Sequence, residues 1–435
     1  MMEIILIATF SIICFFIINK ISKYVKLEKQ ILFLILGIII GLILKKTGYE
    51  SLNNVFPKIS QYNMTALMFM FFCAGFTINV GLLKKSGSLT AKMFSIPTYF
   101  ETIIMSVFIF SIIKFIPSVG YKLGFLEALI IAAIFSTSSP ANIIPICSSM
   151  ISEGYTDKNN IPSTIILASI VDGFVTFPVV FASIFILVMQ NSGADISLKK
   201  ILIIILGSIF AIAIALILGI IIGRLIVTIA SFPFKKLSVD KQAKYKNYLV
   251  ILLAFALSIG ITALLKNIDS LKTAISIFGI LIMCGIGASI NYFDKTGVND
   301  IIRNDGNKLF ALFGMPVIFA YVGSGIDLHS LFNIKQLLFF ATITFVAVYL
   351  KGLAAKFVLR DKKYTKGERK FASLCYIPKG MSLINFTVLF GVILSKDSPF
   401  IIFTTMLGTI SVILTMSIGL PLISRSKGKH LKKYS

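Results

Sequence analysis

The feature that most constrains this chain is a succession of long apolar runs separated by short polar connections. Many runs reach or exceed the roughly 18 residues of a membrane-spanning helix. The pattern predicts an all-α polytopic membrane protein with about 13 transmembrane helices. The expected spans cover residues 2–19, 31–45, 63–83, 91–114, 124–150, 162–189, 199–230, 246–265, 272–292, 308–328, 336–359, 371–395 and 399–423.

Composition excludes several classes of protein. Hydrophobic residues make up 57% of the chain and charged residues 14%, whereas soluble proteins carry about 25% charged residues. A soluble enzyme, a disulfide scaffold and a disordered chain are therefore excluded. The sequence shows no phosphate-binding loop and no zinc-ligand spacing. We therefore expect no enzymatic activity and no cofactor, and any pumping must use the gradient of another solute.

The positive charge points to the membrane surface. The net charge is +24, but the lysines and arginines lie mainly beside the apolar runs, so we expect anionic lipid headgroups, not nucleic acid, as their partner. The odd-numbered connections between spans, together with the C-terminus, carry more than twice as many lysines and arginines as the even-numbered connections. The positive-inside rule then predicts a multi-pass plasma-membrane protein with its N-terminus outside and a short basic cytoplasmic tail at 425–435.

A weak internal repeat suggests inverted symmetry. Residues 75–83 (Gly-Phe-Thr-Ile-Asn-Val-Gly-Leu-Leu) and 323–331 (Gly-Ser-Gly-Ile-Asp-Leu-His-Ser-Leu) share Gly, Ile-(Asn/Asp)-(Val/Leu) and Leu in register. Because the two segments lie an odd number of spans apart, they must face opposite sides of the membrane. Inverted repeats of this kind are typical of secondary transporters. The alternative is a chance likeness between two apolar ends.

Two spans at matching positions of this repeat contain a proline and a polar cluster. Pro140 lies within Ser-Thr-Ser-Ser-Pro-Ala-Asn at residues 136–142, and Pro378 within Tyr-Ile-Pro-Lys-Gly at 376–380. Proline frees a backbone carbonyl, which must be satisfied inside the membrane by protein or by an ion. A matched pair of broken helices predicts a binding site near the membrane midplane. The alternative is two simple proline kinks.

Asp172 lies near the middle of its span. A carboxylate there costs about 2.5–3.5 kcal/mol unless it is protonated, paired or bound to a cation. Lys351, within another span, is its expected partner, while Lys379 occupies the second helix break and Glu101 is expected to pair with one of these lysines. A purely structural ion pair at Asp172 is the alternative to a functional site.

These residues resemble those of the monovalent cation:proton antiporter superfamily, the sodium/proton exchangers. The likeness covers almost the whole chain and rests on residues 74–79, on Ser-Pro-Ala-Asn-Ile-Ile-Pro at 139–145, on Ser-Ile-Val-Asp at 169–172, and on Glu-Arg at 368–369 followed by 376–380. It implies scaffold and dimerisation helices at 1–84 and 246–331, ion-translocation core helices at 89–190 and 336–424, and a linker helix at 199–230. A homodimer is expected.

The resemblance also implies a function. A monovalent cation, Na⁺ or Li⁺ with K⁺ left open, and a proton would compete for Asp172. Thr137, Ser138 and Ser139 would supply nearby oxygens, with Lys351, Lys379 and Glu101 as charge partners. Val171 stands where relatives usually carry Asp or Asn, and Ser139 where many carry Asp. With one carboxylate fewer, we expect one-for-one electroneutral exchange, while a related chain that no longer transports cations stays open.

Two other functional classes remain. A cation-coupled symporter of a small organic anion could use Lys351 and Lys379 as anion donors. A non-transporting sensor or scaffold would have no evident need for a central Asp beside two broken helices.

Overall fold

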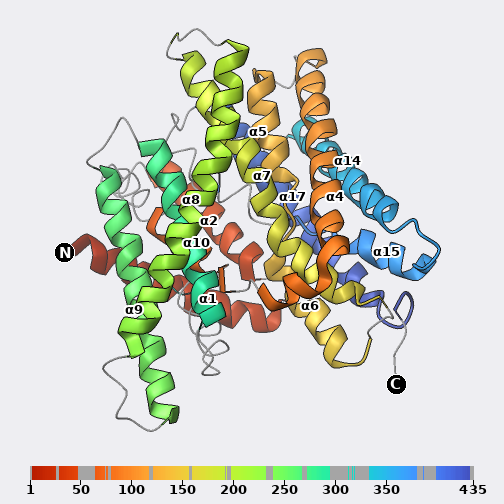
Figure 1. Ribbon diagram of the computed structural model, residues 1–435. Coiled ribbons are helices and arrows are strands. Elements are labelled where there is room, and N and C mark those ends of the chain that lie inside the picture. Colours follow the sequence, from red (N-terminus) through yellow and green to blue (C-terminus); the bar gives the residue numbers. More distant parts are fainter. Residues whose placement is uncertain are drawn as a thin grey trace. The chain divides into compact units, whose positions relative to one another are not determined.

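The protein is described by a computed structural model (Figure 1). The structure describes residues 2–25, 29–47, 64–73, 75–76, 80–116, 121–155, 159–191, 193, 197–231, 239–266, 272–293, 333–379 and 398–431, together with residues 312, 316, 318 and 386. Contacts divide the chain into two compact units. Unit 1 comprises residues 1–80, 210–326 and 388–395, and unit 2 comprises residues 81–209, 327–387 and 396–435.

Unit 1 contains α1 (Met2–Tyr24), α2 (Lys29–Thr47), α9 (Val239–Lys266) and α10 (Lys272–Phe293). α1 packs on α2, and α9 packs on α10. Glycines let backbones approach closely here: a Cβ added at Gly287 would lie 3.1 Å from the Cα of Gly75, and one added at Gly285 would lie 3.1 Å from the Cα of Gly219. Small residues at such positions are a common means of packing membrane helices.

Helix α8 (Leu198–Ser231) begins in unit 2 and continues into unit 1. Its bounds agree with the long span predicted at 199–230. It is apolar on all sides, with a mean hydropathy of 3.2 over its most apolar window, and only 17% of that window is buried. A helix of this kind is suited to lipid contact over most of its surface.

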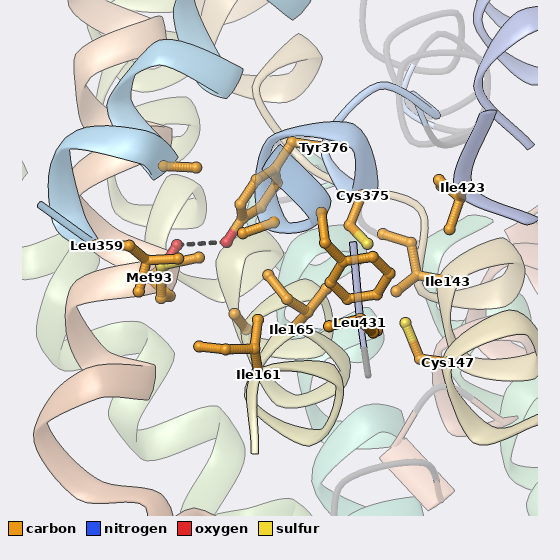
Figure 2. Close-up of a cluster of buried hydrophobic side chains, with 14 of the residues drawn as sticks. Met93, Ile143, Cys147, Ile161, Ile165, Leu359, Cys375, Tyr376, Ile423 and Leu431 are labelled. Atoms are coloured by element: carbon orange, nitrogen blue, oxygen red, sulfur yellow. Dashed lines mark hydrogen bonds between the residues drawn. The ribbon is translucent and has the colours of Figure 1, made fainter. Parts of the chain in front are cut away.

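Unit 2 is built from α4 (Val80–Phe115), α5 (Phe125–Phe135), α6 (Pro140–Ser152), α7 (Ile161–Asn191), α14 (Ile334–Val358), α15 (Lys366–Cys375) and α17 (Pro399–Arg425). α7 packs against both α5 and α6, and α14 packs against both α15 and α17. A buried apolar cluster joins α4, α6, α7, α14, α15 and α17 (Figure 2). Leu431, beyond the end of α17, is buried in the same cluster.

The helices have the lengths and composition of membrane spans. Among the described residues, five helices are long and apolar enough to cross a membrane: residues 87–115 of α4, most of α7, α8, α14 and α17. Shorter apolar helices include α5, part of α6 and residues 64–73.

Several predicted boundaries were wrong, among them the end of the first span, which is Tyr24 and not residue 19. α15 begins at Lys366, five residues before the expected start, because Thr365 and Glu368 form a capping box there. α9 begins at Val239 and not at 246, so Lys241 and Lys244 are helical. Residues 84–90, expected as a connection, lie in α4, where the chain changes direction at Gly87. Its φ of 34° is a conformation that glycine adopts readily.

The second copy of the sequence repeat, residues 323–331, lies outside the described residues, as do residues 77–79 of the first copy. Most of the predicted span at 308–328 lies outside them too. Evidence for the inverted repeat therefore comes from contacts around the helix breaks, within unit 2.

Candidate functional site

The first helix break separates α5 from α6. α5 ends at Phe135, residues 136–139 are not helical, and α6 begins at Pro140. Proline has no N–H to donate, so it suits the first position of a helix and disfavours a helical conformation in the preceding residue. Ser139 accordingly has φ −106° and ψ 88°. Pro140 thus lies at the first position of α6, directly after the non-helical residues.

The second break follows α15. Residues 376–379 are not helical, and residues 380–397 lie outside the described residues apart from the helical Phe386. Ser138 of the first break and Lys379 of the second form an isolated antiparallel bridge. The two interrupted segments therefore cross at these residues. Pro378 lies inside the second break, next to the crossing, and is buried.

Asp172 meets the crossing from α7. Its Oδ2 accepts a hydrogen bond from the backbone N–H of Ser138 at 2.9 Å and forms an ion pair with Lys351 Nζ at 2.9 Å. Lys351 Nζ, from α14, also donates to Ser138 Oγ at 3.0 Å and to the carbonyl oxygen of Ser136. All three protons of the ammonium thus have acceptors. Asp172 and Lys351 are almost completely buried, at 1% and 0% exposure.

The other oxygen of Asp172 is different. Oδ1 is buried and has no hydrogen-bond partner among the described residues. A buried carboxylate oxygen without a partner is costly, and such exceptions call for an explanation. Its lone pairs could take a proton or a hard cation, since such cations prefer oxygen ligands.

A second buried ion pair joins Lys379 to Glu101 of α4. Both side chains are nearly inaccessible to solvent, and the second carboxylate oxygen of Glu101, Oε2, has no hydrogen-bond partner among the described residues. The site therefore holds two acids and two lysines, with no net charge. Charges inside a membrane protein are tolerated when they pair in this way.

The backbone at the two breaks is anchored by corresponding bonds. Ser138 N–H donates to Asp172 on α7, 34 residues later in the chain. Lys379 N–H donates to Thr415 Oγ1 on α17 at 3.0 Å, 36 residues later. Asp172 and Thr415 thus occupy equivalent positions, and the acid of one half is a threonine in the other.

The side chains at the breaks also correspond. Lys379, in the second break, reaches Glu101 on α4, the helix before α5. Ser138, in the first break, accepts from Lys351 on α14, the helix before α15. Each break therefore contacts the helix that lies one element before the other broken segment, which is the relationship expected of two inverted repeats.

The remaining predicted oxygen ligands are engaged elsewhere. Thr137 Oγ1 donates to the carbonyl oxygen of Ile134 at 2.9 Å. Ser139 Oγ accepts from Asn142 Nδ2 at 2.6 Å. Both residues are buried beside the break, but of the three predicted hydroxyl residues only Ser138 contacts the Asp172–Lys351 pair.

Sequence reasoning assigned no role to several residues at the site. Ser136 accepts from Lys351 through its carbonyl and from Thr102 Oγ1 through its hydroxyl at 2.9 Å. Thr415 and Tyr376 also contact the buried lysines. An alignment of the two repeats would have pointed to Thr415, because it lies at the position equivalent to Asp172.

The described residues contain no group of three or more His, Cys, Asp or Glu side chains that could hold a metal ion. The geometry instead offers one carboxylate oxygen at the crossing of two opened helices. An arrangement of this kind can bind a single small cation or a proton.

Three comparisons with known proteins bear on this site. Residues 5–420 match a family model described as "Sodium/hydrogen exchanger, transmembrane". A comparison with curated proteins finds no match. The chain is similar to the solved structure of the sodium proton antiporter MjNhaP1 from Methanocaldococcus jannaschii at pH 8. The identity is 20%, the TM-score is 0.68, and the match covers 98% of this chain and 99% of the other.

The structural similarity extends over nearly the whole chain. It confirms the predicted fold class, an all-helical polytopic membrane protein with a frame of thirteen helices. At 20% identity the comparison speaks for the fold alone.

Proposed function

The chain belongs to the sodium/hydrogen exchanger family, and from this premise we propose that it exchanges a monovalent cation for protons by competition at Asp172. It is thus a multi-pass membrane transporter and not an enzyme. We propose Na⁺ or Li⁺ as the cation, with K⁺ as the alternative. The observation that carries the proposal is the buried carboxylate at the crossing, with one oxygen bonded and the other without a partner in the described part of the chain.

In the proposed cycle, Lys351 neutralises Asp172 when no passenger is bound. A cation or a proton binds to the Asp172 carboxylate and displaces the Lys351 ammonium. When a cation binds, oxygens at the first break complete its coordination shell. Ser138 is the nearest hydroxyl to this pair, while Thr137 and Ser139 would need to release their present partners. The loaded core then changes the side of the membrane to which the site opens.

The charge balance supports electroneutral exchange. If Lys351 keeps its proton throughout, the site carries the same net charge with Na⁺ bound as with a proton bound to Asp172. The core then moves equal charge in both directions, and one cation exchanges for one proton. Val171, beside Asp172, supplies no second carboxylate to change this count.

The contacts of the lysines weigh against the organic-anion alternative. Lys351 and Lys379, the donors that such a symporter would need, are each paired with a carboxylate. Neither ammonium is available to bind an organic anion while these pairs are intact.

We also propose that unit 2 is the moving core and that unit 1 is the scaffold through which a homodimer forms. The boundaries of the two units lie close to the predicted core and scaffold ranges, which supports this assignment. The proposed orientation, with the N-terminus outside and the C-terminus in the cytoplasm, rests on the distribution of lysines and arginines.

Proteoliposomes containing a pH-sensitive dye test the proposal. Adding Na⁺, Li⁺ or K⁺ alone should release protons from vesicles with the wild-type protein, and Asp172→Asn should abolish the release while the protein still inserts and folds. Proton release by Asp172→Asn at the wild-type rate would exclude Asp172 as the carrier. Release that requires an organic solute would favour the symporter.

A further inference from the structure

Tyr376, the first residue of the second break, contacts the lysine of the proposed ion site. Its ring centroid lies 5.1 Å from Lys351 Nζ. Tyr376 and Lys351 are both fully buried, so the contact is shielded from water. A cation near the face of a desolvated aromatic ring is attracted more strongly than it would be at the protein surface.

The ring is held independently of the lysine. Figure 2 shows the hydroxyl of Tyr376 donating to the carbonyl oxygen of Met93 on α4, at 2.7 Å. Tyr376 also belongs to the buried cluster that includes Ile165 of α7 and Cys375 of α15. The ring is thus held by a hydrogen bond to α4 and by packing in a cluster drawn from several helices, so its position does not depend on where the Lys351 ammonium lies.

The contact is close to the limit of its range. Attraction of this kind extends to about 6 Å from the ring centroid, so a small displacement of Nζ that takes it off Asp172 and away from the ring forfeits it. The ring therefore favours the state in which Lys351 occupies the carboxylate over the states in which a passenger has displaced it.

Resting on the proposed function, we propose that Tyr376 is a positioning residue that sets how readily a passenger displaces Lys351 from Asp172. The ring stabilises the Lys351 ammonium, which competes with both the cation and the proton for Asp172. It therefore weakens cation binding and proton binding by the same factor. Among the described residues, the other charged side chains buried at the crossing are Glu101 and Lys379, which pair with each other.

The second lysine provides a matched control. Lys379 Nζ lies 5.0 Å from the ring centroid of Phe135, the last residue of α5. Phe135 and Tyr376 each lie three residues before the bridged pair, Ser138 and Lys379. Phe135→Leu removes an equivalent ring from the lysine that does not contact Asp172.

The test compares Tyr376→Leu, Tyr376→Phe and Phe135→Leu with the wild type in proteoliposomes. Tyr376→Leu should lower the KM for Na⁺ at alkaline pH by about 3- to 10-fold, from the usual range of this interaction. At Na⁺ concentrations far below KM, the pH at which protons half-inhibit exchange should rise by the same factor, about 0.5–1 pH unit. The change in kcat should be smaller than the change in KM.

Tyr376→Phe keeps the ring and should retain the wild-type KM and pH profile, as should Phe135→Leu. Melting temperatures of the purified variants show whether each is folded. An unchanged or raised KM in folded Tyr376→Leu would overturn the proposal, and so would a Tyr376→Phe variant that behaves like Tyr376→Leu. A wild-type protein without cation-driven proton release would instead defeat the proposed function itself.

Discussion

At the scale of single residues, the site combines two buried ion pairs with different surroundings. Asp172 accepts from a backbone N–H as well as from Lys351, whereas Glu101 has Lys379 as its only hydrogen-bond partner among those described. The ionised form of Glu101 therefore depends on Lys379 alone for hydrogen bonding among the described residues. The Glu101–Lys379 pair is therefore the more structural of the two.

Glu101→Gln should destabilise the protein strongly. It would leave Lys379 as an uncompensated charge in the interior, and removal of one member of a buried pair typically costs about 3–5 kcal/mol. Thermal unfolding of the purified protein should show a much lower melting temperature. The double variant Glu101→Gln/Lys379→Met, which removes both charges, should recover most of the loss.

If the double variant is as unstable as Glu101→Gln, this account is wrong. The destabilisation would then come from lost side-chain packing and not from the unpaired charge of Lys379.

At the scale of helices, the position of the second break depends on α17. Gly419 of α17 faces this break: a Cβ added there would lie 2.8 Å from Ile377 Cγ2 and 3.1 Å from Pro378 Cγ. Helix α17 also supplies Thr415, which holds the backbone N–H of Lys379. The absence of a side chain at Gly419 lets helix and break approach closely.

Gly419→Ala should therefore lower stability by about 1–3 kcal/mol, the usual cost of overpacking. The exposed Ser417 lies on the same helix, and Ser417→Ala, which adds no contact, is the matched control. Melting temperatures of the two variants provide the measurement. Equal melting temperatures would show that the break can shift to accommodate a methyl group without cost.

At the scale of the whole molecule, the charge count predicts the response to voltage. Moving one net charge across the membrane changes the free energy by about 2.3 kcal/mol per 100 mV. An exchanger that moves no net charge should keep nearly the same rate when a K⁺ gradient and valinomycin set the membrane potential. A strong dependence of rate on potential would mean that Lys351 or another group also gives up its proton during the cycle.

Orientation can be tested with two exposed lysines of unit 2. Lys122 lies just before α5, and Lys429 lies after α17. The proposed topology places Lys122 outside and Lys429 in the cytoplasm. A membrane-impermeant maleimide should label Lys122→Cys in intact cells and Lys429→Cys only after permeabilisation. The five native cysteines are buried, so unmodified protein serves as the background control.

The sequence by itself determined the class of fold. Long apolar runs have to form helices in a membrane, because each backbone group must find a partner within its own segment. The interruptions were also visible, since Pro140 and Pro378 interrupt such runs. Asp172 stood out for its position in an apolar span and the cost of burying a charge there.

Only the tertiary structure decided which partners meet. Lys351 and Asp172 are 179 residues apart in the chain, and Lys379 and Glu101 are 278 residues apart. The sequence led us to expect Lys351 beside Asp172, but it left open which of the two lysines pairs with Glu101. That choice depends on where the two breaks cross, and the same crossing brings Thr415 and Tyr376 to the lysines. Such contacts follow from packing between distant helices, which a local pattern of residues does not record.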